Sequence, residues 1–293
     1  MNGISESVNM PVVKTGFEKL DARLDGGLYE GLYVIGAVSS LGKTTFCLQM
    51  ADQIAKGGQD VLIFSLEMAK TVLMAKSISR NTCFYCIEHK IDVSNAKSMR
   101  GITDGRRYSR YSEKEKEIIM EAIDAYKKVS KRIFITEGRG NVSVHNVAEV
   151  VQRHIEITGR KPVVFVDYLQ ILTPADPRTS DKQNTDKAVL ELKRISRDYK
   201  IPVIAVSSFN RENYEKEVTM AAFKESGGIE YGCDVLIGLQ LSGAGTNGFN
   251  SKEVKDKNPR PIDLSILKNR HGGLGLPISY SYYTQYNYFR EIQ

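Results

Sequence analysis

The chain has 293 residues, 41% hydrophobic and 26% charged, which is the composition of a soluble globular protein with room for one large or two small domains. Its net charge of +6 is compatible with a nucleic-acid partner but does not require one. No apolar run approaches the ~18 residues of a membrane span, and the N-terminus lacks the plan of a secretion signal. We therefore expect a cytoplasmic protein without a membrane partner.

The four cysteines argue against a disulfide framework in a chain of this length. Cys83 and Cys86 form a CxxC, and His89 follows three residues later. Three ligands are one short of a structural zinc site, and Cys47 and Cys233 fall in segments typical of a helix interior and a strand edge. We therefore expect Mg²⁺, at the site described below, as the one metal.

The N-terminal residues 1–14 are predicted to be a flexible lead-in, in which Pro11 blocks a continuous helix. Residues 15–293 are predicted to form a single domain that opens with a short amphipathic helix within 15–31. Buried strands and helices then alternate. The predicted strands lie at 32–37, 61–66, 132–136, 162–167, 202–207 and 233–239, and the predicted helices at 44–55, 71–80, 113–130, 143–158 and 186–199.

Less regular segments separate these elements. Residues 83–112 are expected to be irregular, 208–228 to form a polar loop, and 241–261 to form a connection rich in Gly, Ser and Lys. The last two predicted strands, at 262–268 and 278–283, are joined by HGGLGLP. The alternation predicts an α/β fold with a mostly parallel sheet covered by helices on both faces, extended by a C-terminal antiparallel hairpin.

A phosphate-binding loop is the strongest local motif. The predicted strand at 32–37 leads into SSLGKTT and then a helix, which is the order that such a loop needs. Its backbone N–H groups and the helix N-terminus favour phosphate, Lys43 would reach the outer phosphates, and the Thr44 hydroxyl would hold Mg²⁺. Ala37 stands where the common pattern has Gly, a mild departure because Ala is also small. The residues predicted to bind ATP are Ser39, Ser40, Leu41, Gly42, Lys43, Thr44 and Thr45.

Two carboxylates stand at the ends of apolar strands, Glu67 after VLIFSL and Asp167 after VVFV. The carboxyl ends of parallel strands meet at the edge where ligands bind, so both acids are expected beside the phosphate loop. Asp167 fits the acid that orients Mg²⁺ and its waters. Glu67 fits the acid that aligns, or takes a proton from, the water attacking the γ-phosphate. Taken singly, either acid could instead cap a helix or lie exposed in a loop.

With these motifs in place, the chain resembles the RecA-like motor domain of the DnaB family of replicative helicases. The motifs SLEM, DYLQ and ESGGIE are more specific than a phosphate loop alone, and they separate this family from RecA-type recombinases and AAA-type ATPases. The matches run in order from about residue 15 to 283. They are TGFEKLD at Thr15, SSLGKTT at Ser39, VLIFSLEM at Val61, VFVDYLQIL at Val164, IPVIAVSSFNRE at Ile201, KESGGIEYGCDV at Lys224 and LKNRHGG at Leu267.

The resemblance implies further site residues. Arg270 would be an arginine finger that enters the ATP site of the next subunit, with Lys268 beside it, and Glu67 would be the catalytic carboxylate. A loop that follows the backbone of single-stranded DNA would include Lys224, Glu225 and Gly227. The resemblance also implies a homo-oligomer, a hexameric ring, with a primase or a loader as further partners. Without it, the bland interpretations of these segments are a solvated hairpin edge and a surface loop without a ligand.

Two departures from the family are visible. Ser208 occupies the position of a Gln that senses the γ-phosphate and links it to the DNA loop, and a Ser is too short to reach as far. The helical N-terminal domain and linker helix of the family are not found in these 293 residues. The chain is therefore expected to be a motor fragment or a stand-alone relative, whose ring formation depends on ATP, DNA or a missing region.

Three hypotheses follow. The first is an ATP-hydrolysing helicase motor that moves along single-stranded DNA in the 5′ to 3′ direction and unwinds duplex DNA. The second is a RecA-like DNA-binding or regulatory ATPase, of the recombination-mediator or loader type, that does not unwind. The third is a structural subunit that binds nucleotide and hydrolyses it slowly, which the presence of Lys43, Glu67 and Asp167 makes the weakest.

Overall fold

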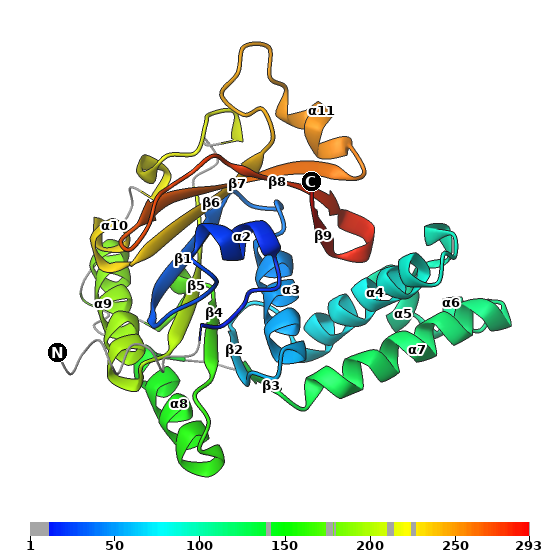
Figure 1. Ribbon diagram of the computed structural model, residues 1–293, viewed down its shortest axis with the longest axis horizontal. Helices are drawn as coiled ribbons and strands as arrows, with labels where there is room; N and C mark the ends of the chain where they lie inside the picture. The colour runs from blue at the N-terminus through cyan, green and yellow to red at the C-terminus, as the bar shows by residue number, and fades with distance from the viewer. Residues whose placement is uncertain are drawn as a thin grey trace.

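The computed structural model describes residues 12–138, 142–173, 178, 180–209, 214–223 and 227–292. Within these residues, nine strands form one sheet in the order β3-β2-β4-β5-β1-β6-β7-β8-β9 (Figure 1). The strands are β1 (Gly31–Ala37), β2 (Val61–Ser65), β3 (Ile133–Glu137), β4 (Val163–Asp167), β5 (Pro202–Ser208), β6 (Val235–Leu241), β7 (Arg260–Asn269), β8 (Ile278–Tyr283) and β9 (Tyr288–Glu291).

The predicted mostly parallel sheet with an antiparallel C-terminal extension is confirmed. Strands β1 to β6 pair in parallel, whereas β6, β7, β8 and β9 pair antiparallel. Strands β1, β2, β4, β5 and β6 are buried along nearly their whole length, which explains their continuous apolar sequences. Strand β8 instead alternates buried and half-buried residues, as expected where one face is packed less deeply.

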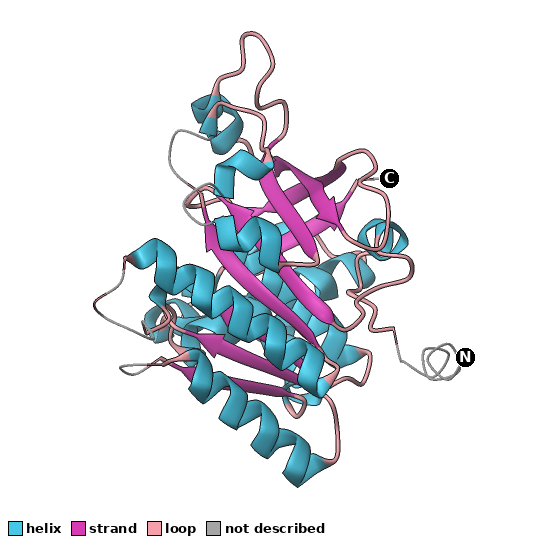
Figure 2. Ribbon diagram, turned by 90° about the vertical axis from the view of Figure 1, so that its left-hand side faces the viewer, coloured by secondary structure: helices cyan, strands magenta, loops and turns pink. Residues whose placement is uncertain are grey.

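Helices cover both faces of the sheet. Helices α8 and α9 lie over one face and α3 over the other (Figures 1 and 2). None of the helices in the described part of the chain has the length and apolar character needed to cross a bilayer. The α-helices are α2 (Glu18–Arg23), α3 (Lys43–Lys56), α4 (Lys70–Glu88), α5 (Met99–Thr103), α6 (Gly105–Tyr108), α7 (Glu113–Ser130), α8 (Val144–Thr158), α9 (Asp181–Tyr199), α10 (Gly227–Gly232) and α11 (Ser251–Asp256).

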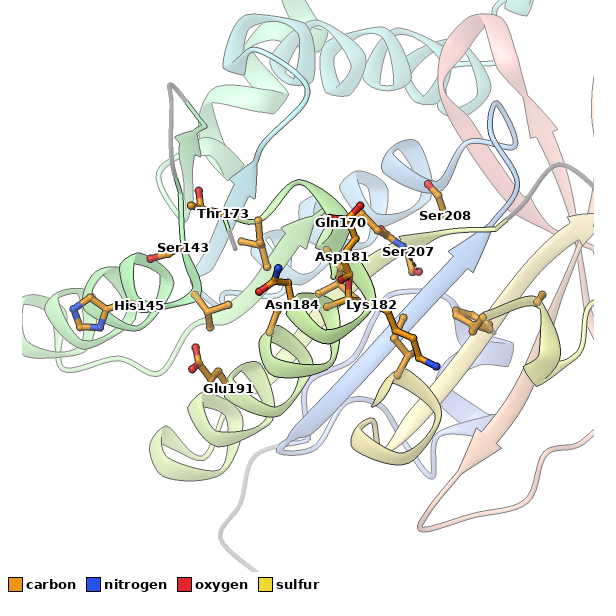
Figure 3. A pocket seen from close by; sticks show the side chains of 18 residues that line it. Ser143, His145, Gln170, Thr173, Asp181, Lys182, Asn184, Glu191, Ser207 and Ser208 are labelled. Atoms are coloured by element: carbon orange, nitrogen blue, oxygen red, sulfur yellow. Dashed lines mark hydrogen bonds between the residues drawn. The ribbon is translucent and has the colours of Figure 1, made fainter. Parts of the chain in front are cut away.

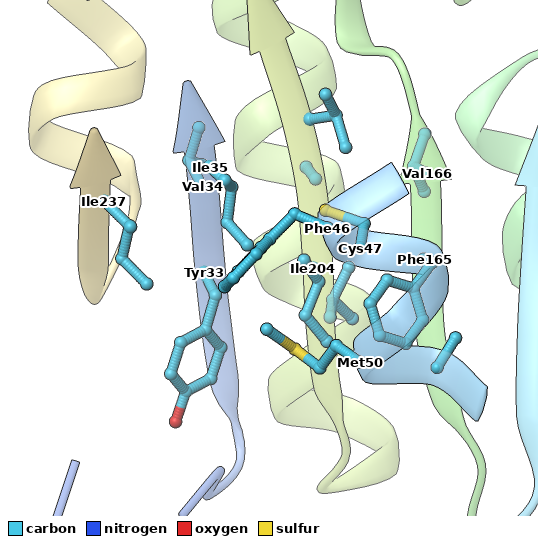
Figure 4. Close-up of a cluster of buried hydrophobic side chains, with 14 of the residues drawn as sticks. Tyr33, Val34, Ile35, Phe46, Cys47, Met50, Phe165, Val166, Ile204 and Ile237 are labelled. Atoms are coloured by element: carbon cyan, nitrogen blue, oxygen red, sulfur yellow. The ribbon is translucent and has the colours of Figure 1, made fainter. Parts of the chain in front are cut away.

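Helix α3 is held in place by the main hydrophobic core. Its side chains Phe46, Cys47 and Met50 point onto the strands and meet Phe165 and Ile204 (Figure 4). All five are buried. Packing of this kind, at roughly 1.5–3 kcal/mol per large apolar side chain, fixes the helix whose N-terminus follows the phosphate loop.

The C-terminal strands clamp the same helix from another side. The ring of Phe46 meets Tyr280 edge to face at 5.6 Å and Phe289 at 5.3 Å, and it stacks on Phe17 at 4.7 Å. The Gln49 side chain donates to the Phe289 carbonyl at 2.8 Å. The β8–β9 extension is therefore part of the wall of the phosphate site and not a loose appendage.

Helices α4 and α7 pack against each other and project from the sheet as an arm (Figure 1). A second apolar cluster stabilises the arm, and it includes Cys83, Cys86 and Ile118. Both cysteines of the CxxC are buried free thiols on α4. Among the described residues, no group of three or more His, Cys, Asp or Glu side chains is arranged to hold a metal ion.

Several predicted boundaries were wrong. Helix α4 runs eight residues beyond its predicted end at Arg80 and reaches into the segment expected to be irregular. The buried Arg80 forms an ion pair with Asp52 and donates to the Asn287 carbonyl at 2.8 Å, so a charged residue lies inside a continuing helix. The segment 89–112 also contains α5, α6 and a 3₁₀ turn, η1 (Val93–Asn95).

Other elements also differ from the prediction. Helix α9 begins five residues early, because Ser180 and Gln183 form a capping box at its start. The N-terminal helix covers only α2, and the strand expected at 233–239 is β6 at Val235–Leu241. Helix α11 and strand β9 were not predicted at all, since α11 is only six residues long and β9 only four.

Residues at the predicted domain boundary are partly described. Val13 and Leu28 form an antiparallel bridge, with N–H to carbonyl distances of 2.9 and 2.7 Å. Residues 1–11 lie outside the described part of the chain. The division into a lead-in of residues 1–14 and a domain of residues 15–293 stays a prediction.

Candidate active site

The phosphate loop joins β1 to α3, as predicted. Gly42 caps α3 at its N-terminus with φ +90°, a left-handed conformation that Gly adopts without strain. A Cβ at this position would lie 2.8 Å from the Tyr282 ring and 3.0 Å from the Phe289 ring. The glycine is thus required both by the backbone conformation and by the aromatic wall from β8 and β9.

The tip of the loop is fixed by two residues that the sequence did not reveal. The Tyr214 hydroxyl donates to the Ser39 carbonyl at 2.7 Å, and Arg260 Nη1 donates to the Ser40 carbonyl at 3.0 Å. The ammonium of Lys255 lies 3.3 Å from the centre of the Tyr214 ring. Tyr214 and Arg260 are 175 and 220 positions away from their partners in sequence, so no local pattern could have linked them to the loop.

Lys43 is the first residue of α3 and turns back onto its own loop. Its Nζ donates to the carbonyls of Ala37 at 3.0 Å and Val38 at 3.4 Å. Burial lowers the pKa of Lys43, and the negative charges of Asp167 and Glu67 act in the opposite direction. The amine is therefore held close to both predicted acids, in the position needed to meet phosphate oxygens.

The two predicted acids lie on neighbouring strands at the same edge of the sheet. Strands β2 and β4 pair in parallel with Ser65 opposite Asp167, and Glu67 lies two residues beyond the end of β2. Asp167 is 6% exposed, and burial raises its pKa although a hydrogen bond with Thr44 and the charge of Lys43 lower it. Glu67 is exposed to solvent. The prediction that both acids flank the phosphate loop agrees with this geometry.

The oxygen donors at this point suit Mg²⁺. The Thr44 hydroxyl lies within hydrogen-bond reach of the Asp167 carboxylate, so one hydroxyl and one carboxylate converge. Magnesium is typically held by one or two protein oxygens and completed by phosphates and water. A pair of hard oxygen donors beside a phosphate loop therefore fits the metal, and no larger cage of protein ligands is required.

Arg270 and Lys268 lie at the opposite end of β1 from the phosphate loop. The Asp234 amide donates to the Leu32 carbonyl at 2.8 Å, and the Arg270 amide donates to the Asp234 carbonyl at 2.9 Å. Arg270 is therefore level with the first residues of β1, whereas the phosphate loop follows the last residue, Ala37. Five strand residues separate these levels by about 16 Å along the strand axis.

Both cations bind the end of α10. Lys268 Nζ donates to the carbonyls of Glu230 at 2.6 Å and Cys233 at 2.8 Å. Arg270 Nη2 donates to the Tyr231 carbonyl at 3.4 Å, and Nη1 lies 3.6 Å from the buried carboxylate of Asp234. The Arg270 side chain is still 49% exposed. Its guanidinium is thus attached along one edge and open to a partner along the other.

The buried Asp234 is a further residue that the sequence did not reveal. Its carboxylate accepts the Leu32 N–H at 2.7 Å and pairs with Lys193 of α9 as well as with Arg270. It therefore joins three segments, at the start of β1, in α9 and at the end of β7. Its place directly before a buried strand was the sequence signal that could have drawn attention to it.

The predicted DNA loop is described only in part. Lys224 and Glu225 lie outside the described residues, whereas Gly227 begins α10. The neighbouring Gly228 N–H donates to the Asp186 carboxylate of α9 at 2.9 Å. The end of the predicted loop is therefore attached to α9, and through α10 to the strand that carries Arg270.

A largely polar cavity of about 570 Å³ lies beside this loop, between the starts of α8 and α9 and the end of β5 (Figure 3). Ser208, which replaces the expected Gln, lines it. In the same cavity wall, Gln170 Nε2 donates to the Ser207 hydroxyl at 3.0 Å. Gln170 follows β4 and its Asp167, so this bond links the carboxyl ends of β4 and β5.

A sheet of this order, with a phosphate loop after β1 and acids after β2 and at the end of β4, defines a nucleotide-binding domain of the RecA-like α/β class. The model of the DnaB-like helicase C terminal domain family matches residues 12–291. The chain belongs to this family, and the resemblance read from its motifs is confirmed.

The relatives agree with this assignment. The chain is 27% identical over 287 residues to the replicative DNA helicase DnaC of Bacillus subtilis (strain 168), with 96% of this chain and 57% of the relative covered. It is 26% identical over 289 residues to the replicative DNA helicase DnaB of Geobacillus stearothermophilus, with the same shares covered. The chain thus spans little more than half the length of these relatives.

Solved structures confirm the fold. One structure of an isolated ATPase domain superposes with a TM-score of 0.81 at 23% identity, covering 99% of this chain and 96% of that chain. A DnaB-like replicative helicase, described with its interactions with primase, gives a TM-score of 0.80 at 23% identity and covers 97% of this chain and 63% of that chain. The predicted fold class is confirmed by both.

Proposed function

We propose that this chain is the ATP-hydrolysing motor domain of a replicative-type DNA helicase. The observation that carries the proposal is the division of the site. Lys43, Thr44, Glu67 and Asp167 lie together at the carboxyl edge of the sheet, and Arg270 lies about 16 Å away along β1. One chain therefore offers both halves of an ATP site, but on different faces, as a ring of identical subunits requires.

Within one subunit, the loop residues from Ser39 to Thr45 would hold the phosphates. Lys43 would exchange its bonds to the carbonyls of Ala37 and Val38 for phosphate oxygens, at little cost because it is already extended beside them. Thr44 and Asp167 would hold Mg²⁺, which when bound neutralises charge on the outer phosphates. Glu67 would align the attacking water, and its exposure leaves it accessible to solvent.

Between subunits, Arg270 would complete the site of a neighbour. Its free edge carries N–H donors that can bind an oxygen of the transferred phosphoryl group in the transition state. Lys268 would act beside it, but its ammonium must first leave the two carbonyls at the end of α10. Hydrolysis would thus depend on a homo-oligomer, for which we propose a hexameric ring.

Single-stranded DNA is the proposed substrate track, with movement in the 5′ to 3′ direction. Lys224, Glu225 and Gly227 would contact its backbone, and the polar cavity beside α10 gives room for this loop to move. The short Ser208 cannot reach across the cavity as a Gln would. Because Gln170 already bonds to Ser207, we infer that it carries part of the contact between the ATP site and the DNA loop.

The partners and the compartment are proposed on the same basis. Since one similar structure is described with its interactions with primase, a primase is a candidate partner, and a loader is a second candidate. A motor that needs ATP and single-stranded DNA is expected to work in the cytoplasm, where both are present.

ATP turnover with and without single-stranded DNA tests the proposal. The wild-type chain should hydrolyse ATP faster with DNA, and Lys43→Ala and Glu67→Gln should each reduce turnover at least about 100-fold. Lys128→Ala, an exposed change on α7, is the matched control and should turn over ATP as the wild type does. DNA-independent turnover together with no DNA affinity would favour the regulatory ATPase that does not unwind, the alternative that Ser208 favours.

A further inference from the structure

Lys76 on α4 lies against the phosphate loop from a side that no motif identifies. Its Nζ donates to the Thr45 hydroxyl at 3.1 Å, and Thr45 directly follows Thr44. The side chain of Lys76 is half-buried, whereas Thr45 is buried. The ammonium of Lys76 therefore covers the second residue after Lys43 and leaves two further N–H donors to satisfy.

No carboxylate of the described residues lies within ion-pair distance of this ammonium. The nearest candidate, Asp52, is already paired with Arg80, which follows Lys76 by one helical turn. Burial lowers the pKa of Lys76, the positive charge of Arg80 lowers it further, and the more distant Asp167 raises it. A desolvated cation beside a second cation destabilises the empty site unless an anion binds there.

We propose that Lys76 is a second phosphate-binding cation of the nucleotide site, and that it contacts the inner phosphates that ADP and ATP share. Lys43 and Thr44 serve the outer phosphates and the metal in the proposed function, on which this inference rests. Thr45 is one residue deeper in α3, and Lys76 reaches it from α4. The two lysines would thus grip the phosphate chain from opposite sides, one from the loop and one from the arm.

This assignment has a consequence for the arm. Helix α4 begins three residues after Glu67 and packs against α7, so a bond from Lys76 to nucleotide ties the arm to the bound ligand. Nucleotide binding would then restrain α4 relative to α3, even when only ADP is present.

Binding of MgADP and of a non-hydrolysable MgATP analogue, measured by calorimetry, tests the inference. Lys76→Met keeps the length of the stem and removes the charge. It should weaken both ligands by about tenfold or more, the loss expected for one hydrogen bond to a charged group. Lys76→Arg should stay within about threefold of the wild type, because it keeps the cation. Lys128→Met, an exposed change on α7, should bind as the wild type does.

Stability provides the second readout. Because the empty site gains nothing from the charge of Lys76, Lys76→Met should unfold in urea at the same or a higher midpoint than the wild type. A lower midpoint together with weak binding would reduce Lys76 to a structural residue and overturn the inference. Unchanged binding of both ligands, or weaker binding of the ATP analogue alone, would also overturn it.

The failure of the proposed function would look different. A wild-type chain that binds neither ligand, or a Lys43→Ala chain that binds both normally, would refute the phosphate site itself. Normal wild-type binding with a Lys43→Ala defect, but no Lys76→Met defect, would refute the role of Lys76 alone.

Discussion

Arg270 should act only on the ATP site of another subunit, and mixing two inactive variants tests this. Arg270→Ala keeps an intact phosphate loop and lacks the finger, whereas Lys43→Ala keeps the finger and lacks the loop. If the finger acts in trans, each variant alone should lose at least about 1,000-fold in turnover, the lower range for an arginine finger. A mixture should regain activity, because an interface can combine the good half of each chain.

The size of the recovery follows from the geometry. Arg270 is level with Leu32, about 16 Å from the loop along β1, so it cannot reach its own site. In a random equimolar mixture, a productive interface needs an Arg270→Ala chain beside a Lys43→Ala chain in one orientation, which occurs at about one quarter of the interfaces. Turnover in the mixture should therefore approach about 25% of the wild-type rate per interface.

The assay is a coupled ATPase measurement at fixed total protein with single-stranded DNA present, as the mixing ratio is varied. The rate should follow a bell-shaped curve with its maximum at equal amounts. A rate that stays at the sum of the two single variants at every ratio would refute action in trans. A double variant that carries both changes is the control, and it should not restore activity to either partner.

Three further predictions concern the support of the site. Gly42→Ala should cost about 2–4 kcal/mol in urea unfolding, because it adds left-handed strain and a clash with the Tyr282 ring. The matched Gly58→Ala, which has φ +95° but no heavy atom within 4 Å of a built Cβ, should cost only about 1–2 kcal/mol, and equal losses would contradict the clash. Asp234→Asn keeps an acceptor for the Leu32 N–H but frees Arg270, so DNA-stimulated turnover should fall about tenfold with a midpoint change of less than about 1 kcal/mol. Unchanged turnover would remove Asp234 as a positioning residue. A hydrogen bond from Lys97 lowers the pKa of Glu115 to about 2, so the stability that this bond adds is present above the ordinary pKa of 4.5 and is lost as the pH falls towards 2. Urea unfolding of Glu115→Gln should therefore show a deficit near pH 7 that disappears near pH 2, and a deficit independent of pH would contradict this assignment.

The cis half of the site was predictable because its residues follow buried strands or form one continuous loop. Lys43, Thr44, Glu67 and Asp167 are all placed by the rule that parallel strands end at one edge, and that rule depends only on the alternation of strands and helices. The same regularity explains why the sheet and its antiparallel extension were predicted correctly. Only short or polar elements, such as β9 and α11, were missed.

The remaining contacts join segments far apart in sequence and leave no local pattern. Tyr214 and Arg260 reach the loop from the region around β6 and β7, and Lys76 reaches it from α4. Arg270 was identified by resemblance, but its distance from its own loop follows only from the pairing of β1, β6 and β7. Long-range packing decides these positions, so the structure was needed to find them.

Strand separation on a forked DNA duplex tests the central claim most directly. The wild-type chain, at a concentration at which it assembles with ATP and DNA, should displace the labelled strand of a fork in an ATP-dependent manner. Glu67→Gln should bind the same fork but displace no strand. Wild-type chains that hydrolyse ATP on single-stranded DNA yet never separate the fork, or Lys43→Ala chains that separate it as well as the wild type, would contradict the account of this domain as a helicase motor.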